Sequence, residues 1–229
     1  MNRRRTDIAA PLARLYDRID CCRFCRRDRN RLLHIHGAGA RRPDLMLVLV
    51  NPTHRNLSSD PAGEHAAGPR FPFIGVRQFW RVLADGGLID QKVAAALPPR
   101  AGWRPEHTEL VRRELVRNRL YLSNIVKCCY PHGDYPAPEV VRDQLGLLAE
   151  EVRLVRPRRI VAFGCLVHRT LTGENVTLSE YWRPGAGRKP AREKLTGLGL
   201  PVVPCYFPIG RGNPKKAAAV LRRIARLSR

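Results

Sequence analysis

The residues with the clearest chemical potential lie at residues 121–128, which read Tyr-Leu-Ser-Asn-Ile-Val-Lys-Cys. This apolar run predicts a buried strand with an amide, Asn124, near its end and a thiol, Cys128, just beyond it. An Asn in a pocket donates and accepts hydrogen bonds at once, which suits the edge of a nucleobase. A thiol at that place can meet the upstream pair Cys22-x-x-Cys25. The combination indicates nucleic-acid chemistry beside a metal-binding site.

The charge balance favours the same partner. The chain of 229 residues carries 42 Lys and Arg against 20 Asp and Glu, a formal net charge of +22. Such an excess attracts polyanions, of which nucleic acid is the commonest, although a preference for Arg codons would also raise the count. We therefore expect DNA as the partner.

The start of the chain is basic, but no apolar segment of signal-peptide length follows it, and no run is long enough to span a bilayer. We expect a cytoplasmic protein with no membrane partner. The seven Cys then lie in a reducing compartment, where thiols more often bind metal or stay free than pair.

Elements that could position these residues are visible as short apolar runs rich in Val, Ile and Leu. Such runs are typical of strands that are covered on both faces, as in a parallel sheet. The strands are predicted at residues 45–50, 120–126, 160–163 and 202–206.

Helical spacing of apolar residues predicts helices between these strands, at residues 7–20, 75–88 and 141–155. Pro157 closes the third of them. A last helix begins with Asn213 as N-cap and Pro214 at its first position. The alternation predicts one α/β domain over residues 1–229, with three α/β/α layers and a mostly parallel four-stranded sheet.

Several motifs in this order resemble the uracil-DNA glycosylase superfamily, nearest to its iron–sulfur branch (family 4). They are Cys22-x-x-Cys25, the strand at 45–48 with its Pro-containing loop, Pro-Phe-Ile-Gly at 72–75, residues 121–128, the strand at 160–164, and the strand at 202–206 followed by Pro208. The resemblance implies an enzyme that extrudes uracil or a related deaminated base and hydrolyses its N-glycosidic bond. It also implies a monomer.

The resemblance implies roles for particular residues. Phe73 matches the aromatic that stacks on the extruded base, and a core position beside Phe79 is the alternative. Asn124 matches the Asn that reads the uracil edge. Asn51, before Pro52, is similar to the Asn that positions the attacking water in the mismatch-specific and single-strand-selective branches.

Two departures from the family pattern bear on activity. The acidic residue of the iron–sulfur branch is missing from the first loop, where Asp60 and Glu64 are further candidates for a base. Phe207 stands where the family has a His that stabilises negative charge on the uracil oxygen. A Phe cannot donate a hydrogen bond, but it could wedge into the base stack.

The segment after Phe207 leads to the start of the last helix, and exposed amides there suit a DNA phosphate. We expect Arg211, Asn213 and Lys215 to bind DNA.

The predicted metal site is incomplete. Cys22, Cys25 and Cys128 match three thiolates of a 4Fe-4S cluster, which normally takes four. The fourth would fall near Asp143, and Asp143, Cys21 or Cys129 could serve. A zinc ion and no metal at all are the alternatives. Cys165 and Cys205 are expected to be buried packing thiols in strand regions.

Two other readings remain open from sequence. One is a DNA-binding protein on the same fold that excises nothing, which both departures favour. The other is a small metal-stabilised nucleic-acid protein unrelated to glycosylases.

Overall fold

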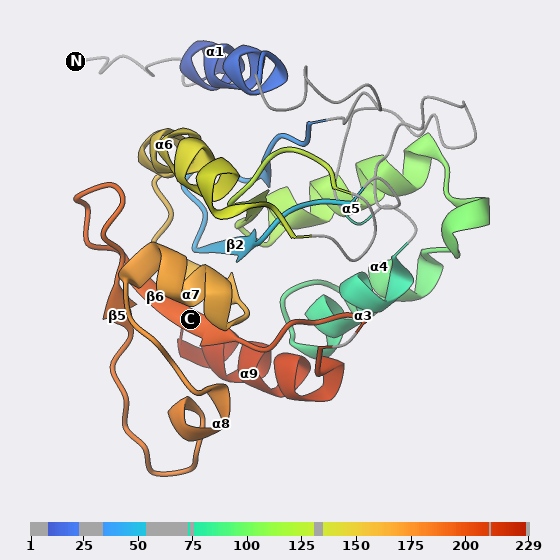
Figure 1. The fold of residues 1–229 in the computed structure, drawn as a ribbon. Coiled ribbons are helices and arrows are strands. Elements are labelled where there is room, and N and C mark those ends of the chain that lie inside the picture. Colours follow the sequence, from blue (N-terminus) through green and yellow to red (C-terminus); the bar gives the residue numbers. More distant parts are fainter. Residues whose placement is uncertain are drawn as a thin grey trace, which may run out of the picture.

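The structure is a computed structural model, which describes residues 9–22, 34–53, 73, 76–130, 135–210 and 212–227. Its centre is a six-stranded sheet with the order β1-β3-β2-β4-β6-β5 (Figure 1). Four inner strands run parallel to one another: β2 (Leu45–Leu49), β3 (Leu120–Asn124), β4 (Arg159–Phe163) and β6 (Pro201–Cys205). They confirm the four predicted strands.

Each edge of the sheet carries a short antiparallel strand that the sequence did not predict. β1 (Ala38–Gly39) pairs with β3, and β5 (Ala191–Arg192) pairs with β6. A strand of two residues is too short to leave a periodic pattern in the sequence. The predicted α/β class with a mostly parallel sheet is confirmed, with two more strands than expected.

Among the described elements, one helix precedes the first strand along the chain, one follows the last strand, and the others lie between strands. They are α1 (Ala9–Asp20), α3 (Arg77–Asp85), α4 (Gln91–Ala96), the 3-10 turn η2 (Arg100–Gly102), α5 (Pro105–Arg117), α6 (Pro138–Val155), α7 (Cys165–Thr172), α8 (Leu178–Tyr181) and α9 (Pro214–Leu227).

The four predicted helices correspond to α1, α3, α6 and α9. The α9 start is as expected, because the Asn213 side chain accepts a hydrogen bond from the Lys216 backbone N–H at 3.0 Å, and Pro214 is the first residue. The prediction for Cys165 was wrong: it is exposed at the first residue of α7, whereas Cys205 is buried in β6.

Side chains alternate between the two faces of the sheet, and each face has its own helices (Figure 1). One face packs against α3, α4, α5 and α9, and the other against α6 and α7, with α1 packed on α6. The three predicted layers are therefore present. None of the helices in the described part of the chain has the length and apolar character needed to cross a bilayer.

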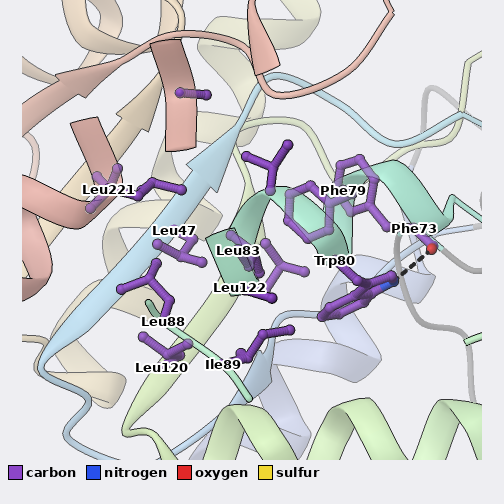
Figure 2. Close-up of a cluster of buried hydrophobic side chains, with 14 of the residues drawn as sticks. Leu47, Phe73, Phe79, Trp80, Leu83, Leu88, Ile89, Leu120, Leu122 and Leu221 are labelled. Carbon is purple, nitrogen blue, oxygen red and sulfur yellow. Dashed lines mark hydrogen bonds between the residues drawn. The ribbon is translucent and has the colours of Figure 1, made fainter. Parts of the chain in front are cut away.

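The first face is filled by large apolar side chains (Figure 2). Phe79 and Trp80 of α3 are fully buried, and Leu47 and Leu122 meet them from neighbouring strands. We call the buried apolar side chains of this face, Phe73 among them, the α3 cluster. Burying a Leu or Phe side chain stabilises a fold by about 1.5–3 kcal/mol, so this packing holds α3 firmly against the sheet.

Candidate functional site

The carboxyl ends of three parallel strands bring the predicted base-binding residues to one edge of the sheet. Asn51 follows β2 by two residues, Asn124 ends β3, and Phe207 follows β6 by two residues. In open parallel sheets this edge is where ligands bind.

Backbone pairing continues past the strands and fixes Asn51 beside the β3 chain. The N–H groups of Ile125 and Val126 donate to the carbonyls of Leu49 and Val50 at 2.8 and 2.9 Å. Asn51 is partly exposed, and its side-chain amide donates to the Pro52 carbonyl at 3.1 Å. This bond orients the Asn51 side chain and leaves its carbonyl oxygen as the group that could accept from a water.

Asn124 is nearly inaccessible, with 1% of its surface exposed. Its Oδ1 is buried and has no hydrogen-bond partner among the described residues. A buried polar atom without a partner costs about 1–3 kcal/mol, so such an atom marks a place where a ligand or water supplies the missing bond. The pleat alternation places Asn124 on the same face as Leu122 of the α3 cluster.

Phe73 also belongs to this cluster. Its ring stacks on Phe79 with centroids 4.0 Å apart and 13° between the planes, and its side chain is 4% exposed (Figure 2). Its φ of 64° lies in the left-handed region, and the Trp80 indole N–H donates to its carbonyl at 3.1 Å. The alternative that Phe73 lies beside Phe79 is thus present in the structure. Phe73 and Asn124 both belong to the side of the sheet that the α3 cluster fills.

Phe207 is 36% exposed at the end of β6. Its carbonyl accepts from the Asn213 backbone N–H at 2.9 Å, and a Cβ on Gly212 would lie 2.1 Å from the same oxygen. The turn into α9 therefore requires glycine at 212. Lys215 is exposed on α9, the Asn213 side chain is used as helix cap, and Arg211 lies outside the described residues.

The other face of β3 leads to the thiols. Cys22 and Cys128 are buried with their Sγ atoms 3.5 Å apart, and a ring nitrogen of His34 completes a set of ligand atoms within 4.8 Å of one another. The sequence predicted that Cys22 and Cys128 meet, and the structure brings them together. The sequence did not predict that His34 lies beside them. Cys25, the third predicted thiolate, lies outside the described residues.

Gln144 of α6, and not its neighbour Asp143, faces the thiols. Its Nε2 donates to the sulfurs of Cys22 and Cys128 at 3.2 and 3.3 Å. Asp143 is exposed and is not among the side chains that gather there, so its role as a ligand stays a prediction.

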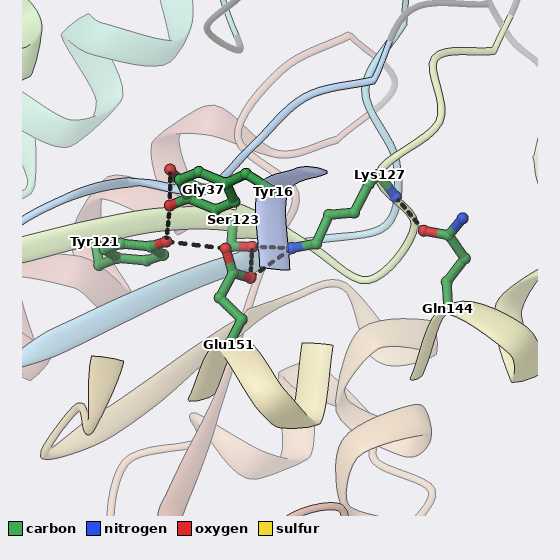
Figure 3. Close-up of polar contacts among 7 residues, drawn as sticks. All are labelled: Tyr16, Gly37, Tyr121, Ser123, Lys127, Gln144 and Glu151. Carbon is green, nitrogen blue, oxygen red and sulfur yellow. Dashed lines mark hydrogen bonds and ion pairs between the residues drawn. The ribbon is translucent and has the colours of Figure 1, made fainter. Parts of the chain in front are cut away.

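A buried polar network lies on this face (Figure 3), and Gln144 connects it with the thiols. Lys127 and Glu151 are both fully buried and pair at 2.5 Å, and the Ser123 hydroxyl donates to the same carboxylate at 2.6 Å. Tyr121 donates to the other carboxylate oxygen at 2.9 Å, and its hydroxyl lies 2.9 Å from that of Tyr16 on α1. We call these five residues the polar network.

Burial and the Glu151 charge raise the pKa of both tyrosines above the ordinary value, so both hydroxyls stay protonated. A Cβ at position 37 would lie 2.2 Å from Glu151 Oε1, so Gly37 is the residue that lets the network close. The polar network ties α1, β3 and α6 together directly behind Asn124.

Comparison with known proteins defines the class. The family model of the uracil DNA glycosylase superfamily matches residues 37–227. The chain therefore belongs to the uracil DNA glycosylase superfamily, which confirms the resemblance inferred from the motifs.

A curated relative belongs to the type-4 branch of the superfamily. The chain is 26% identical over 160 residues to a type-4 uracil-DNA glycosylase from Pyrobaculum aerophilum, an alignment that covers 70% of this chain and 64% of that protein. The matched region thus spans a little under two thirds of the relative's length.

Proposed function

We propose that this chain is a DNA-repair glycosylase that flips out uracil, or a related deaminated base, and hydrolyses its N-glycosidic bond. The observation that carries the proposal is the buried Asn124 Oδ1, which has no partner among the described residues and lies at the carboxyl edge of the sheet. Membership of the superfamily and the similarity to a type-4 enzyme support it.

Asn124 suits the edge of uracil. The base presents an N–H donor between two carbonyl acceptors, so an amide can accept from the N–H with Oδ1 and donate to a carbonyl with Nδ2. Pairing the buried oxygen would remove its desolvation cost only when the right base is bound. Phe73, on the same face, would stack on the base, an interaction worth about 1–3 kcal/mol.

Asn51 would hold the attacking water. An amide is no strong base, but departure of the uracil anion does most of the bond breaking, so the water needs orientation more than deprotonation. The bond from Asn51 Nδ2 to Pro52 fixes that orientation.

We expect slow excision, because Phe207 stands where the family has a hydrogen-bond donor. Without a donor at this position, the developing charge on the uracil oxygen loses one hydrogen bond, which typically costs on the order of a hundredfold to a thousandfold in rate. Phe207 is exposed enough to wedge between bases of a kinked duplex.

The DNA backbone would be held by the basic surface, including Arg211 and Lys215. Because bound phosphates release counterions, affinity should fall steeply with salt. We propose that the protein acts as a single-domain monomer in the cytoplasm. Light scattering on the purified chain would test the oligomeric state.

The 4Fe-4S cluster implied by the type-4 resemblance would need four ligands, each on a different iron atom. The described donors are two thiols 3.5 Å apart and one imidazole, with the Gln144 amide at both sulfurs. This set fits a single ion better than a cluster, so no step of the proposed reaction passes through the metal.

The test is uracil excision from single- and double-stranded oligonucleotides that carry one uracil, scored by alkaline strand cleavage. We expect cleavage by the natural chain and its loss in Asn51→Ala, with DNA affinity unchanged. Binding without cleavage of uracil, hypoxanthine or xanthine substrates would instead leave a DNA-binding protein on a glycosylase fold.

A further inference from the structure

The thiol site contains three buried donors of two chemical kinds. Cys22, His34 and Cys128 are 9%, 6% and 1% exposed, and their ligand atoms lie within 4.8 Å of one another. Thiolates and imidazoles together are the ligands that zinc prefers in proteins.

The backbone holds these donors in place. Cys22 follows α1 by two residues, with its N–H donating to the Ile19 carbonyl at 3.1 Å. His34 forms an antiparallel bridge with Cys128, and the next residue, Ile35, donates to the Lys127 carbonyl at 2.9 Å. Direct pairing of these two segments therefore brings His34 next to Cys128, although the two residues are far apart in sequence.

The two nitrogens of His34 have different surroundings. Nδ1 lies 3.8 Å from Asp20 Oδ1, an oxygen whose closer partner is His36 Nε2 at 3.0 Å, whereas Nε2 is buried and has no hydrogen-bond partner among the described residues. A carboxylate near one imidazole nitrogen with a metal on the other is the usual arrangement around a metal-bound His. The unpartnered nitrogen is unexplained without a ligand.

Gln144 prepares the sulfurs. Its Oε1 accepts from the Lys127 backbone N–H at 3.0 Å, which turns Nε2 toward Cys22 and Cys128. Hydrogen bonds to ligand atoms are typical of the surroundings of a metal site. The amide nitrogen itself has no lone pair to offer a metal, so Gln144 supports the site without being a ligand.

The spacing of the sulfurs fits a single ion better than a cluster. Two thiolates on one tetrahedral zinc, with Zn–S bonds of about 2.3 Å, lie roughly 3.8 Å apart. The Sγ atoms of Cys22 and Cys128 are 3.5 Å apart, close to that value. In a 4Fe-4S cluster no two thiolates share an iron, so their sulfurs lie farther apart.

We propose that Cys22, His34 and Cys128 supply three of the four tetrahedral ligands of one zinc ion, with Gln144 bonding both sulfurs. Two thiolates and a neutral imidazole balance the charge of Zn²⁺, which makes the site neutral and therefore compatible with burial. The ion would fasten the end of α1 to the chain that follows Asn124. The inference concerns this metal site alone and stands whether or not uracil is excised.

The first test measures metal and sulfide on the full chain, expressed with ample iron, zinc and cluster-assembly proteins and purified without oxygen. We expect about one zinc per chain, no acid-labile sulfide and no visible iron–sulfur absorption. Iron and sulfide in stoichiometric amounts would overturn the proposal. So would a metal-free protein or a disulfide between Cys22 and Cys128.

X-ray absorption at the zinc edge of the same sample tests the ligand set without any substitution. We expect a sulfur shell at about 2.3 Å together with a nitrogen shell at about 2.0 Å. A shell of sulfur alone would exclude His34.

Matched variants then test each donor. Cys22→Ser, His34→Gln and Cys128→Ser should lose most of the zinc. Their sequence neighbours Cys21→Ser and Cys129→Ser should retain it, since neither belongs to the donor set. Equal zinc in both groups would contradict the assignment, and the absorption spectrum decides the case if a donor variant does not fold.

Discussion

The two faces of β3 are both buried, yet they end in different chemistry. On one face, Leu120 and Leu122 lead to Asn124 beside the α3 cluster. On the other, Tyr121 and Ser123 bond to Glu151, and the chain continues to the thiols. One strand thus separates the proposed base-binding site from the proposed zinc site by the width of a sheet. The apolar face would shape the recognition site, whereas the polar face fixes the strand that carries it.

The polar network should be the more costly face to break. Lys127→Met would remove the buried cation that pairs with Glu151, and breaking such a pair typically destabilises a fold by about 3–5 kcal/mol. Chemical denaturation of the variant and the natural chain measures the difference.

A double variant separates an unpaired charge from lost packing. In Lys127→Met with Glu151→Leu no buried charge remains, so we expect much of the loss to be recovered. An equal or larger loss in the double variant would show that the pair contributes net stability. Leu47→Ala on the apolar face, expected to cost about 2–5 kcal/mol, serves as the packing reference.

Gln144 connects the polar network with the thiol site, because it bonds to the Lys127 backbone and to both sulfurs. Gln144→Leu removes its bonds to both sulfurs, and a change of this kind typically weakens metal affinity by about 10–100-fold. Competition with a chromophoric chelator measures it. Asp143→Asn is the matched control, and we expect no change; a loss of metal in that variant would make Asp143 a ligand.

The smallest effect concerns His168 of α7, which packs on the same face. Burial lowers its pKa from the usual value, although a hydrogen bond with the Glu174 carbonyl opposes this. The unfolded chain therefore takes up the proton first, and stability should fall as the pH drops below about 6.5. Between about pH 7 and pH 5, the melting temperature should therefore change less with pH for His168→Gln than for the natural chain. Identical slopes would contradict the assignment.

Much of this architecture could be predicted because its signals are local. The four inner strands are continuous apolar runs, and α9 has both an N-cap Asn and a Pro at its first position. The edge strands β1 and β5 depend on tertiary contact and leave no pattern.

The site was predictable where one element carries the residue. Asn124 and Cys128 lie on or just after one strand. His34 was missed because only its pairing with Cys128 brings it to the thiols. A Lys at 127 inside an apolar run and a Glu at 151 on the inner face of α6 were visible signals of a buried pair. Their meeting depends on packing that the sequence does not display.

The most direct measurement of the central claim is single-turnover excision of uracil, and of thymine, from otherwise identical oligonucleotides by the natural chain and by Asn124→Ala. We expect the natural chain to excise uracil and leave thymine. The variant should be slower by on the order of a hundredfold or more at unchanged DNA affinity, because the buried oxygen pairs with the base. Equal uracil excision by the two proteins would show that Asn124 does not read the base.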